Sequence, residues 1–141
     1  MLSLVIPLYN EEKSIETLCL EIDAVTRDAG LKTEMILVDD GSTDGSWAEI
    51  VKLVQKHAHI RGIRFRRNFG KAAALSAGFS DARGDVVITL DADLQDNPSE
   101  IPNLIAKLNE GYDLVNGWKR RRFDPWHKVI ASRIFNWTSG S

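Results

Sequence analysis

A short apolar run that ends in acidic residues is the most constraining feature of this sequence. Residues 86–90, Val-Val-Ile-Thr-Leu, are almost all β-branched or apolar, as is typical of a strand buried on both faces of a sheet. Residues 91–96 follow and read Asp-Ala-Asp-Leu-Gln-Asp. Ligands of open α/β sheets bind at the carboxyl ends of the strands. We therefore expect a functional site here; the alternative is a solvated acidic turn.

The residue types in this acidic segment indicate a divalent cation site. Asp91 and Asp93 place two carboxylates two residues apart, and Gln95 adds an amide oxygen. Hard oxygen ligands of this kind bind Mg²⁺ or Mn²⁺, and such ions commonly share their ligand shell with substrate phosphates. An EF-hand is excluded, because its sixth position would be Asp96 instead of glycine and its twelfth would be Pro102 instead of glutamate.

Composition limits the classes of protein that remain. A chain of 141 residues, 43% of them hydrophobic and 27% charged, is long enough for one globular domain with a core. The formal net charge of −2 gives no nucleic-acid signature, although bases gather at 61–71 and 119–122. Cys19 is the single cysteine, which excludes an internal disulfide and a cysteine zinc framework. The sequence has no signal-peptide pattern and no apolar run of about 20 residues, so any membrane contact is expected to be peripheral or made by parts outside this sequence.

Strand and helix signals alternate along the chain. We expect a mainly parallel sheet with helices on both faces, because βαβ units with right-handed crossovers produce that architecture. The predicted strands are 2–6, 35–38, 63–66, 86–90 and 112–116, and helical apolar spacing lies between them and again after Asp124.

Several boundary predictions follow from single residues. Pro7 is expected to end the first strand, since proline cannot donate a ladder hydrogen bond. Asn10 is expected to cap the helix that carries Cys19 as a core residue, and Asp44 to cap the next one. The small residues of the helix at 71–82, including Gly78, predict a close approach of its backbone to the sheet.

Four loops that follow strands are expected to converge on one edge of the sheet. They are residues 7–11, 39–42, 68–71 and 91–96, and the carboxyl ends of parallel strands meet at the same edge. A dinucleotide fold is excluded because no G-x-G-x-x-G follows the first strand, and no Walker lysine loop is present. Pro7 and Tyr9 offer a flat wall for a base instead, and the nearby carboxylates offer acceptors for its ring N–H or for a ribose.

The four loop motifs together resemble those of the family 2 glycosyltransferases. Within that family they resemble the polyprenyl-phosphate sugar transferases related to dolichyl-phosphate mannose synthase. The resemblance rests on Pro-x-Tyr-Asn-Glu at 7–11, Val-Asp-Asp-Gly-Ser-Thr-Asp at 38–44, Asn-Phe-Gly-Lys at 68–71 and the acidic segment at 91–96. It implies a Rossmann-like GT-A fold, α/β with a mainly parallel sheet, over residues 1–141. It also implies that this domain is truncated on the C-terminal acceptor side.

The resemblance also implies roles for individual residues. Asp93 and Gln95 would bind Mg²⁺ or Mn²⁺ bridging the donor diphosphate. Asp91, Asp93 and Lys119 would be catalytic, Lys119 lying in a basic run where relatives usually present Gly-x-Arg. The nucleotide sugar would contact Pro7, Tyr9, Glu11, Val38, Asp39, Asp40, Lys71, Asp91 and Ala92.

The activity implied is inverting transfer of a sugar from a UDP or GDP donor to a polyprenyl phosphate, undecaprenyl or dolichyl. Such an enzyme would serve cell-envelope biogenesis, either in the cytoplasm or at the cytoplasmic face of the membrane. It would contact the membrane surface peripherally and bind no nucleic acid. A homo-oligomer is possible. Two alternatives remain: a family 2 transferase acting on a cell-surface polysaccharide, and a non-catalytic nucleotide-sugar binding module.

Overall fold

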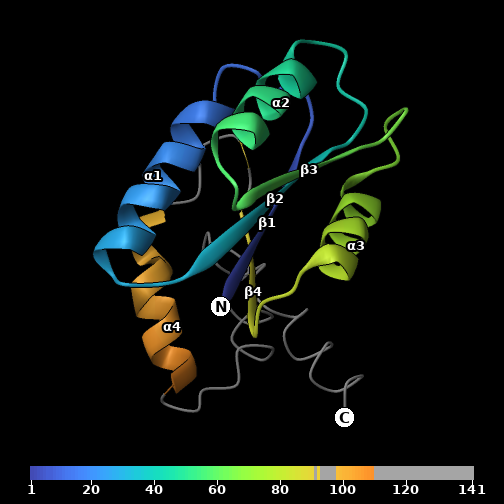
Figure 1. Cartoon of the computed structure of the whole chain (residues 1–141). Coiled ribbons are helices and arrows are strands. Elements are labelled where there is room, and N and C mark those ends of the chain that lie inside the picture. The colour runs from blue at the N-terminus through green and yellow to red at the C-terminus, as the bar shows by residue number, and fades with distance from the viewer. Residues whose placement is uncertain (91, 93–97, 110–141) are drawn as a thin grey trace.

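Four parallel strands form the central sheet, in the order β3-β2-β1-β4 (Figure 1). The computed structural model describes residues 1–90, 92 and 98–109. The strands are β1 (Leu2–Leu8), β2 (Thr33–Asp39), β3 (Ile60–Arg64) and β4 (Val86–Thr89). The predicted parallel sheet is confirmed. The strand, basic loop and helix expected beyond residue 110 lie outside the described residues.

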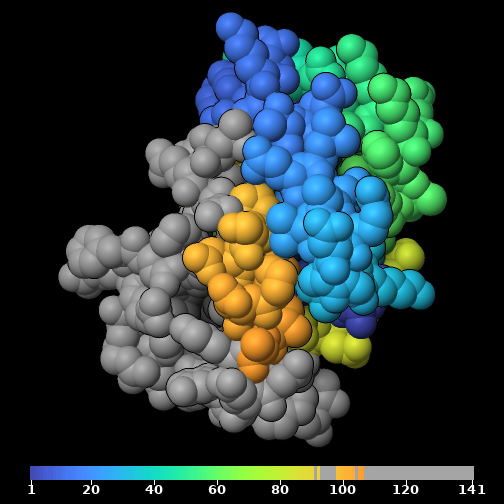
Figure 2. Space-filling view, turned by 90° about the vertical axis from the view of Figure 1, so that its left-hand side faces the viewer, coloured from blue at the N-terminus to red at the C-terminus, as the bar shows by residue number. Residues whose placement is uncertain are grey.

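Helices cover both faces of the sheet, as the alternation of signals predicted. Figure 1 shows α1 (Ile15–Asp28) and α2 (Ser46–Lys56) on one face and α3 (Lys71–Asp81) on the other. A 3₁₀ turn, η1 (Pro98–Glu100), leads into α4 (Ile101–Asn109). The space-filling view shows α4 packed alongside α1 (Figure 2). Within the described ranges, none of the helices has the length and apolar character that crossing a bilayer requires.

The core is divided by the sheet into two layers, because successive strand residues point to opposite faces. Leu4 and Ile6 of β1 pack toward α1 with Cys19, which is buried as predicted. Val5 faces α3. A Cβ added at Gly78 would lie 2.3 Å from Cγ1 of Val5, so the α3 backbone rests directly on the sheet. The predicted close approach is confirmed.

The prediction that Pro7 ends the first strand is wrong. β1 continues to Leu8, and Pro7 pairs with Val38 of β2. The carbonyl oxygen of Val5 accepts a hydrogen bond from the backbone N–H of Leu90 on the β4 side. The backbone nitrogen of Pro7 faces the same side, because the bonding direction of strand residues alternates with a period of two. The ladder between β1 and β4 ends at the Val5–Thr89 pair, before position 7 would have to donate. The missing N–H therefore costs no ladder bond.

The prediction that Asn10 caps the first helix is also wrong. α1 begins at Ile15, and Ser14 occupies the N-cap position. Asn10 has a backbone φ of 53°, a left-handed conformation that asparagine tolerates better than most residues. It therefore turns the chain between β1 and α1.

Candidate functional site

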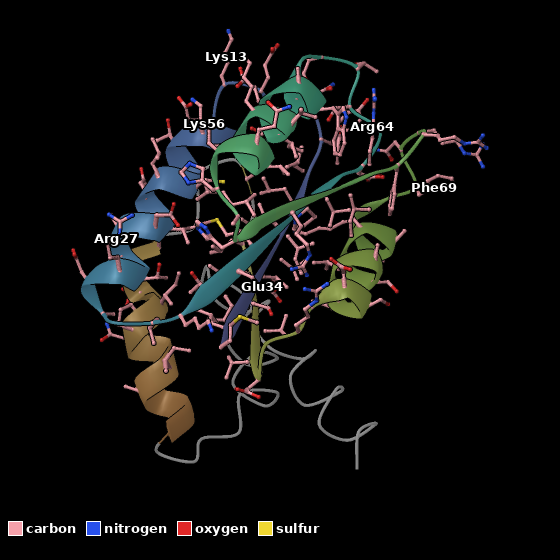
Figure 3. The ribbon with its side chains drawn as sticks, viewed as in Figure 1. Lys13, Arg27, Glu34, Lys56, Arg64 and Phe69 are labelled. Atoms are coloured by element: carbon pink, nitrogen blue, oxygen red, sulfur yellow. The ribbon has the colours of Figure 1, made fainter. Side chains whose placement is uncertain are left out.

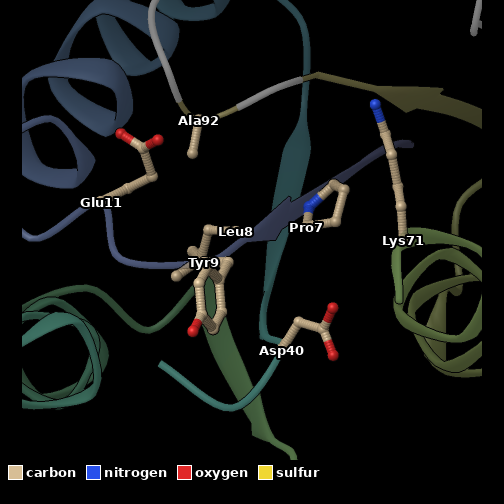
Figure 4. Close-up of a pocket in the computed structure, with 7 residues that line it drawn as sticks. All are labelled: Pro7, Leu8, Tyr9, Glu11, Asp40, Lys71 and Ala92. Carbon is tan, nitrogen blue, oxygen red and sulfur yellow. The ribbon is translucent and has the colours of Figure 1, made fainter. Parts of the chain in front are cut away.

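A cavity of about 280 Å³ opens at the carboxyl edge of the sheet (Figure 4). Its walls come from four separate segments: the end of β1 with the connection to α1, the residue after β2, the start of α3 and the residue at position 92. It is lined by Pro7, Leu8, Tyr9, Glu11, Asp40, Lys71 and Ala92. The convergence expected of the four loops is therefore present, and Leu8 is the one lining residue that the sequence reasoning did not single out.

The cavity combines a flat wall with charged groups. Tyr9 is 43% exposed, so its ring is accessible from the cavity beside Pro7 (Figure 4). Glu11, Asp40 and Lys71 add two carboxyl groups and an amine around this wall. A ring surface with a few convergent polar groups is the usual composition of a small-molecule site.

Asp40 fixes the start of α3 as well as lining the cavity. Its carboxylate accepts hydrogen bonds from the backbone N–H of Phe69 at 2.7 Å and of Gly70 at 3.0 Å. Gly70 has a φ of 103° and occupies the N-cap position of α3, directly before Lys71. Asp40 thus determines where the first residue of α3 stands relative to the cavity.

Two residues predicted to contact the nucleotide sugar do not line the cavity. Val38 is buried in the core layer beneath α3. Asp39 is fully buried, and its Oδ1 accepts a hydrogen bond from the N–H of Ser42 at 2.9 Å. Within the part of the chain that is described, its Oδ2 has no hydrogen-bond partner. Asp39 therefore shapes the turn after β2 from inside.

Asn10 joins the two loops that follow β1 and β2. Its Oδ1 accepts hydrogen bonds from the backbone N–H of Thr43 at 2.8 Å and of Asp44 at 3.3 Å. Its own N–H donates to Oγ of Ser42 at 2.8 Å. These bonds hold the segment that carries Tyr9 against the segment that carries Asp40.

The prediction that Asp44 caps α2 is wrong by one position, because Gly45 occupies the N-cap. Asp44 organises the start of α2 from the residue before this N-cap. Its Oδ1 accepts hydrogen bonds from the N–H of Ser46 at 2.9 Å and from the Ser46 hydroxyl at 2.6 Å. Desolvation opposes ionisation of this carboxyl, but the hydrogen bonds outweigh it and lower the pKa of Asp44.

Ser14 links the β1–α1 connection to position 92. Its hydroxyl lies 2.7 Å from the carbonyl oxygen of Ala92 and 2.9 Å from Oε2 of Glu11, both acceptors within hydrogen-bonding distance. The side chain makes no capping bond to α1 although Ser14 stands at the N-cap. Ala92 is buried, so this contact fixes the carbonyl at the cavity wall. The local sequence does not signal this contact, because Asn10 is the expected cap and a serine just before a helix normally bonds within that helix.

Comparison with known proteins decides the family. Residues 3–139 match the profile of the family described as "Glycosyl transferase family 2". The chain belongs to this family. Its predicted α/β fold of the GT-A type is confirmed by the parallel sheet and by similar solved glycosyltransferase structures.

Two solved glycosyltransferases illustrate the similarity. The mannosyltransferase PcManGT from Pyrobaculum calidifontis, in complex with GDP-Man and Mn²⁺, is 27% identical with a TM-score of 0.63, covering 74% of this chain and 31% of that one. Glucosyl-3-phosphoglycerate synthase from Mycobacterium tuberculosis, in complex with UDP, is 26% identical with a TM-score of 0.63, covering 81% of this chain and 42% of that one. This glycosyltransferase chain thus spans less than half the length of either relative.

The predicted cation ligands of this glycosyltransferase lie outside the described residues. The cation ligands are Asp93 and Gln95. Asp91 and Lys119 of the predicted catalytic set also lie outside the described residues. Ala92, between Asp91 and Asp93 in the sequence, is held at the cavity wall. A carboxylate and an amide oxygen form a hard donor set that suits Mg²⁺ or Mn²⁺. Elsewhere in the described ranges, the structure has no cluster of three or more His, Cys, Asp or Glu side chains that could hold a metal.

Proposed function

We propose that this glycosyltransferase domain moves a sugar, with inversion, from a UDP or GDP donor to a polyprenyl phosphate. The observation that supports this most is the cavity itself, where an exposed tyrosine, a proline, two carboxyl groups and a lysine from separate loops surround one space. The solved relatives bound to GDP-Man and to UDP support a nucleotide donor.

The nucleoside end of the donor would occupy the tyrosine side of the cavity. The ring of Tyr9 stacks on the base, and Pro7 closes the same wall. Glu11 and Asp40 accept hydrogen bonds from a ring N–H or from ribose hydroxyls, since ionised carboxylates are acceptors only. Asp91 and the Ala92 backbone would hold the ribose. Asp40 has lone pairs left for this role while it holds the α3 start.

The diphosphate end would lie toward the acidic segment and the basic residues. Asp93 and Gln95 would hold the divalent cation. When bound, that ion stabilises the negative charge that grows on the diphosphate as it leaves. Lys71 adds a positive charge from the start of α3, and Lys119 contributes another. A lysine ammonium serves here as a compact point charge with rotatable donors.

The acceptor would be the anionic oxygen of a lipid phosphate. That oxygen attacks the anomeric carbon of the sugar, a new carbon–oxygen bond forms, and the bond from the anomeric carbon to the diphosphate breaks on the opposite face. Because the attacking oxygen is already charged near neutral pH, a strong general base is not required. We place the reaction at the cytoplasmic face of the membrane, with the protein as a peripheral partner.

Radiolabelled sugar transfer tests this proposal. The protein is incubated with UDP- or GDP-sugars and Mn²⁺, and with either undecaprenyl phosphate or a saccharide acceptor. Label in the lipid phosphate product is expected. Label only in the saccharide would assign a polysaccharide acceptor instead, and donor binding without any transfer would indicate a binding module.

A further inference from the structure

The end of β3 and its connection to α3 carry an exposed cationic and aromatic surface. We call it the Arg–Phe surface and define it by Arg64, Arg66, Arg67 and Phe69, all of them exposed. The connection projects beyond the two elements that it joins (Figure 1). Phe69 is 54% exposed. The ion pairs found among the described residues include none of these three arginines.

Aromatic rings and guanidinium groups are interleaved on this surface. The guanidinium of Arg67 lies over the Phe69 ring, 4.7 Å from its centroid. That ring meets the ring of Phe65 edge-on, with centroids 5.6 Å apart. The guanidinium of Arg64 lies 5.6 Å from the centroid of the Trp47 ring. Positive charge and apolar area are therefore presented together.

The base of the Arg–Phe surface is anchored to the cavity wall. Asp40 accepts the N–H of Phe69, as described above. Gly41 packs so tightly against this connection that an added Cβ would lie 2.1 Å from the carbonyl carbon of Arg67. The surface therefore has a fixed orientation relative to the cavity.

We propose that the Arg–Phe surface docks on an anionic phospholipid bilayer. Guanidinium groups bind phosphate oxygens in pairs of hydrogen bonds, and an aromatic ring beside them fits the boundary between headgroups and acyl chains. An acidic protein partner is less well matched, because a stable interface buries about 800 Å² on each side and this surface offers one exposed ring. The net charge of −2 argues against general binding of nucleic acid.

Docking at this surface extends the proposed function, and its role in the reaction rests on that proposed function. A lipid phosphate acceptor is embedded in a bilayer, so the enzyme must bring its cavity to that bilayer. The Arg–Phe surface adjoins the cavity through Asp40 and can supply that contact. The binding itself is measurable without any sugar transfer.

Vesicle co-sedimentation tests the docking surface. The protein is mixed with vesicles of phosphatidylcholine, with or without phosphatidylglycerol, at low and at high salt. Binding is expected only with phosphatidylglycerol and is expected to weaken with salt. The double variant Arg66→Ala/Arg67→Ala is expected to lower the partition coefficient about 25-fold, at about fivefold for each arginine. Phe69→Trp is expected to raise it, since tryptophan favours the membrane interface.

A matched control removes the same charge elsewhere. Arg27 of α1 and Lys56 of α2 are exposed and lie on the other side of the molecule from Phe69 (Figure 3). Arg27→Ala/Lys56→Ala is expected to retain vesicle binding within about twofold, because charges beyond a Debye length of about 10 Å are largely screened. An equal loss in this control, or equal binding to neutral vesicles, would overturn the proposal. Displacement from vesicles by equimolar polyuridylate would also overturn it, by assigning the surface to nucleic acid.

A transfer assay separates this inference from the proposed function. Arg66→Ala/Arg67→Ala is expected to transfer sugar normally to a short, water-soluble polyprenyl phosphate and to lose most transfer to undecaprenyl phosphate in vesicles. Equal transfer to both acceptors would contradict the docking role. If the parent protein transfers sugar to neither acceptor while still binding anionic vesicles, the proposed function fails and the docking surface stands.

Discussion

The hydroxyl of Ser14 lies 2.7 Å from the carbonyl oxygen of Ala92, across 78 positions of sequence. The contact ties the N-cap of α1 to Ala92, the second residue of the acidic segment. It also includes Glu11, whose Oε2 is 2.9 Å from the same hydroxyl. Ser14 therefore joins the nucleoside wall of the cavity to the segment that carries the proposed cation ligands.

Ser14→Ala is expected to weaken donor binding chiefly when Mn²⁺ is present. The variant loses the bond that holds Ala92, so a loss of about 1 kcal/mol, or roughly fivefold in affinity, is expected in the Mn²⁺-dependent part of binding. Titration calorimetry with a nucleotide sugar, with and without Mn²⁺, measures both parts. Ser14→Thr keeps the hydroxyl and serves as the control. Equal weakening with and without the metal would show that Ser14 has only a structural role.

Replacement of Asn10 tests the joint between the β1 and β2 loops. Asn10→Ala removes the acceptor for two backbone N–H groups and puts alanine at a φ of 53°. A loss of about 2 kcal/mol in unfolding free energy is expected in urea melts. Asn10→Asp keeps an acceptor oxygen and tolerates the same backbone, so it should stay within about 0.5 kcal/mol of the parent. If both variants lose the same stability, the joint does not depend on this side-chain oxygen.

A second buried network, at the opposite end of the sheet, predicts a pH dependence of stability. Glu34 is buried and accepts hydrogen bonds from the hydroxyl of Ser3, the N–H of Arg83 and the guanidinium of Arg61. Burial would raise the pKa of Glu34, but these bonds outweigh it and lower that pKa below its ordinary value of 4.5. The ionised form is thus the one that the fold stabilises.

The sign of this effect follows from linkage. A depressed folded-state pKa adds stability that is present above about pH 4.5 and is lost as the pH falls through the folded-state value. Urea unfolding between pH 6 and pH 3 should therefore show a decline that Glu34→Gln flattens. The exposed carboxylate Glu21 supplies the matched control, and Glu21→Gln should keep the full decline. A Glu34→Gln curve parallel to the parent's would contradict this assignment.

Cys19 is expected to be inert in the native protein. Burial, followed by the nearby charges of Asp23 and Glu16, raises the pKa of its thiol to about 12. The thiolate is the reactive form, and at pH 8 roughly one molecule in ten thousand would carry it. Labelling with a thiol-reactive disulfide should be slow in buffer and fast in urea. Native labelling as fast as that of an exposed thiol would place Cys19 outside the core.

Among the described residues, periodicity predicts the parallel sheet and its helices, although β3 begins at Ile60 and ends at Arg64 instead of spanning the predicted 63–66. The strand predicted at 86–90 agrees with β4 to within one residue. The spacing of Ile15, Leu18 and Ile22 matches the buried side of α1. The carboxyl-edge rule was enough to bring most of the proposed nucleotide contacts to one cavity. These inferences need only local spacing and the geometry of parallel strands.

The remaining features depend on neighbours that the local sequence does not reveal. Pro7 is tolerated inside β1 because the ladder to β4 stops at Thr89. Ser14 gives up its capping role for a carbonyl 78 positions away. Val38 and Asp39 belong to the predicted nucleotide-sugar site, yet Val38 is buried in the core layer and Asp39 in the interior of the turn. In each case a tertiary contact overrides the local preference.

The central claim is a cavity that binds a nucleotide sugar together with a divalent cation held by Asp93. Titration calorimetry of UDP- and GDP-sugars, with and without Mn²⁺, on the parent and on Asp93→Ala measures it most directly. We expect the parent to bind one donor at least about tenfold more tightly with Mn²⁺, a difference of about 1.4 kcal/mol. Asp93→Ala is expected to lose this Mn²⁺-dependent gain in affinity and to keep the melting temperature of the parent. Equal binding of donor and Mn²⁺ by the parent and by Asp93→Ala would contradict the account.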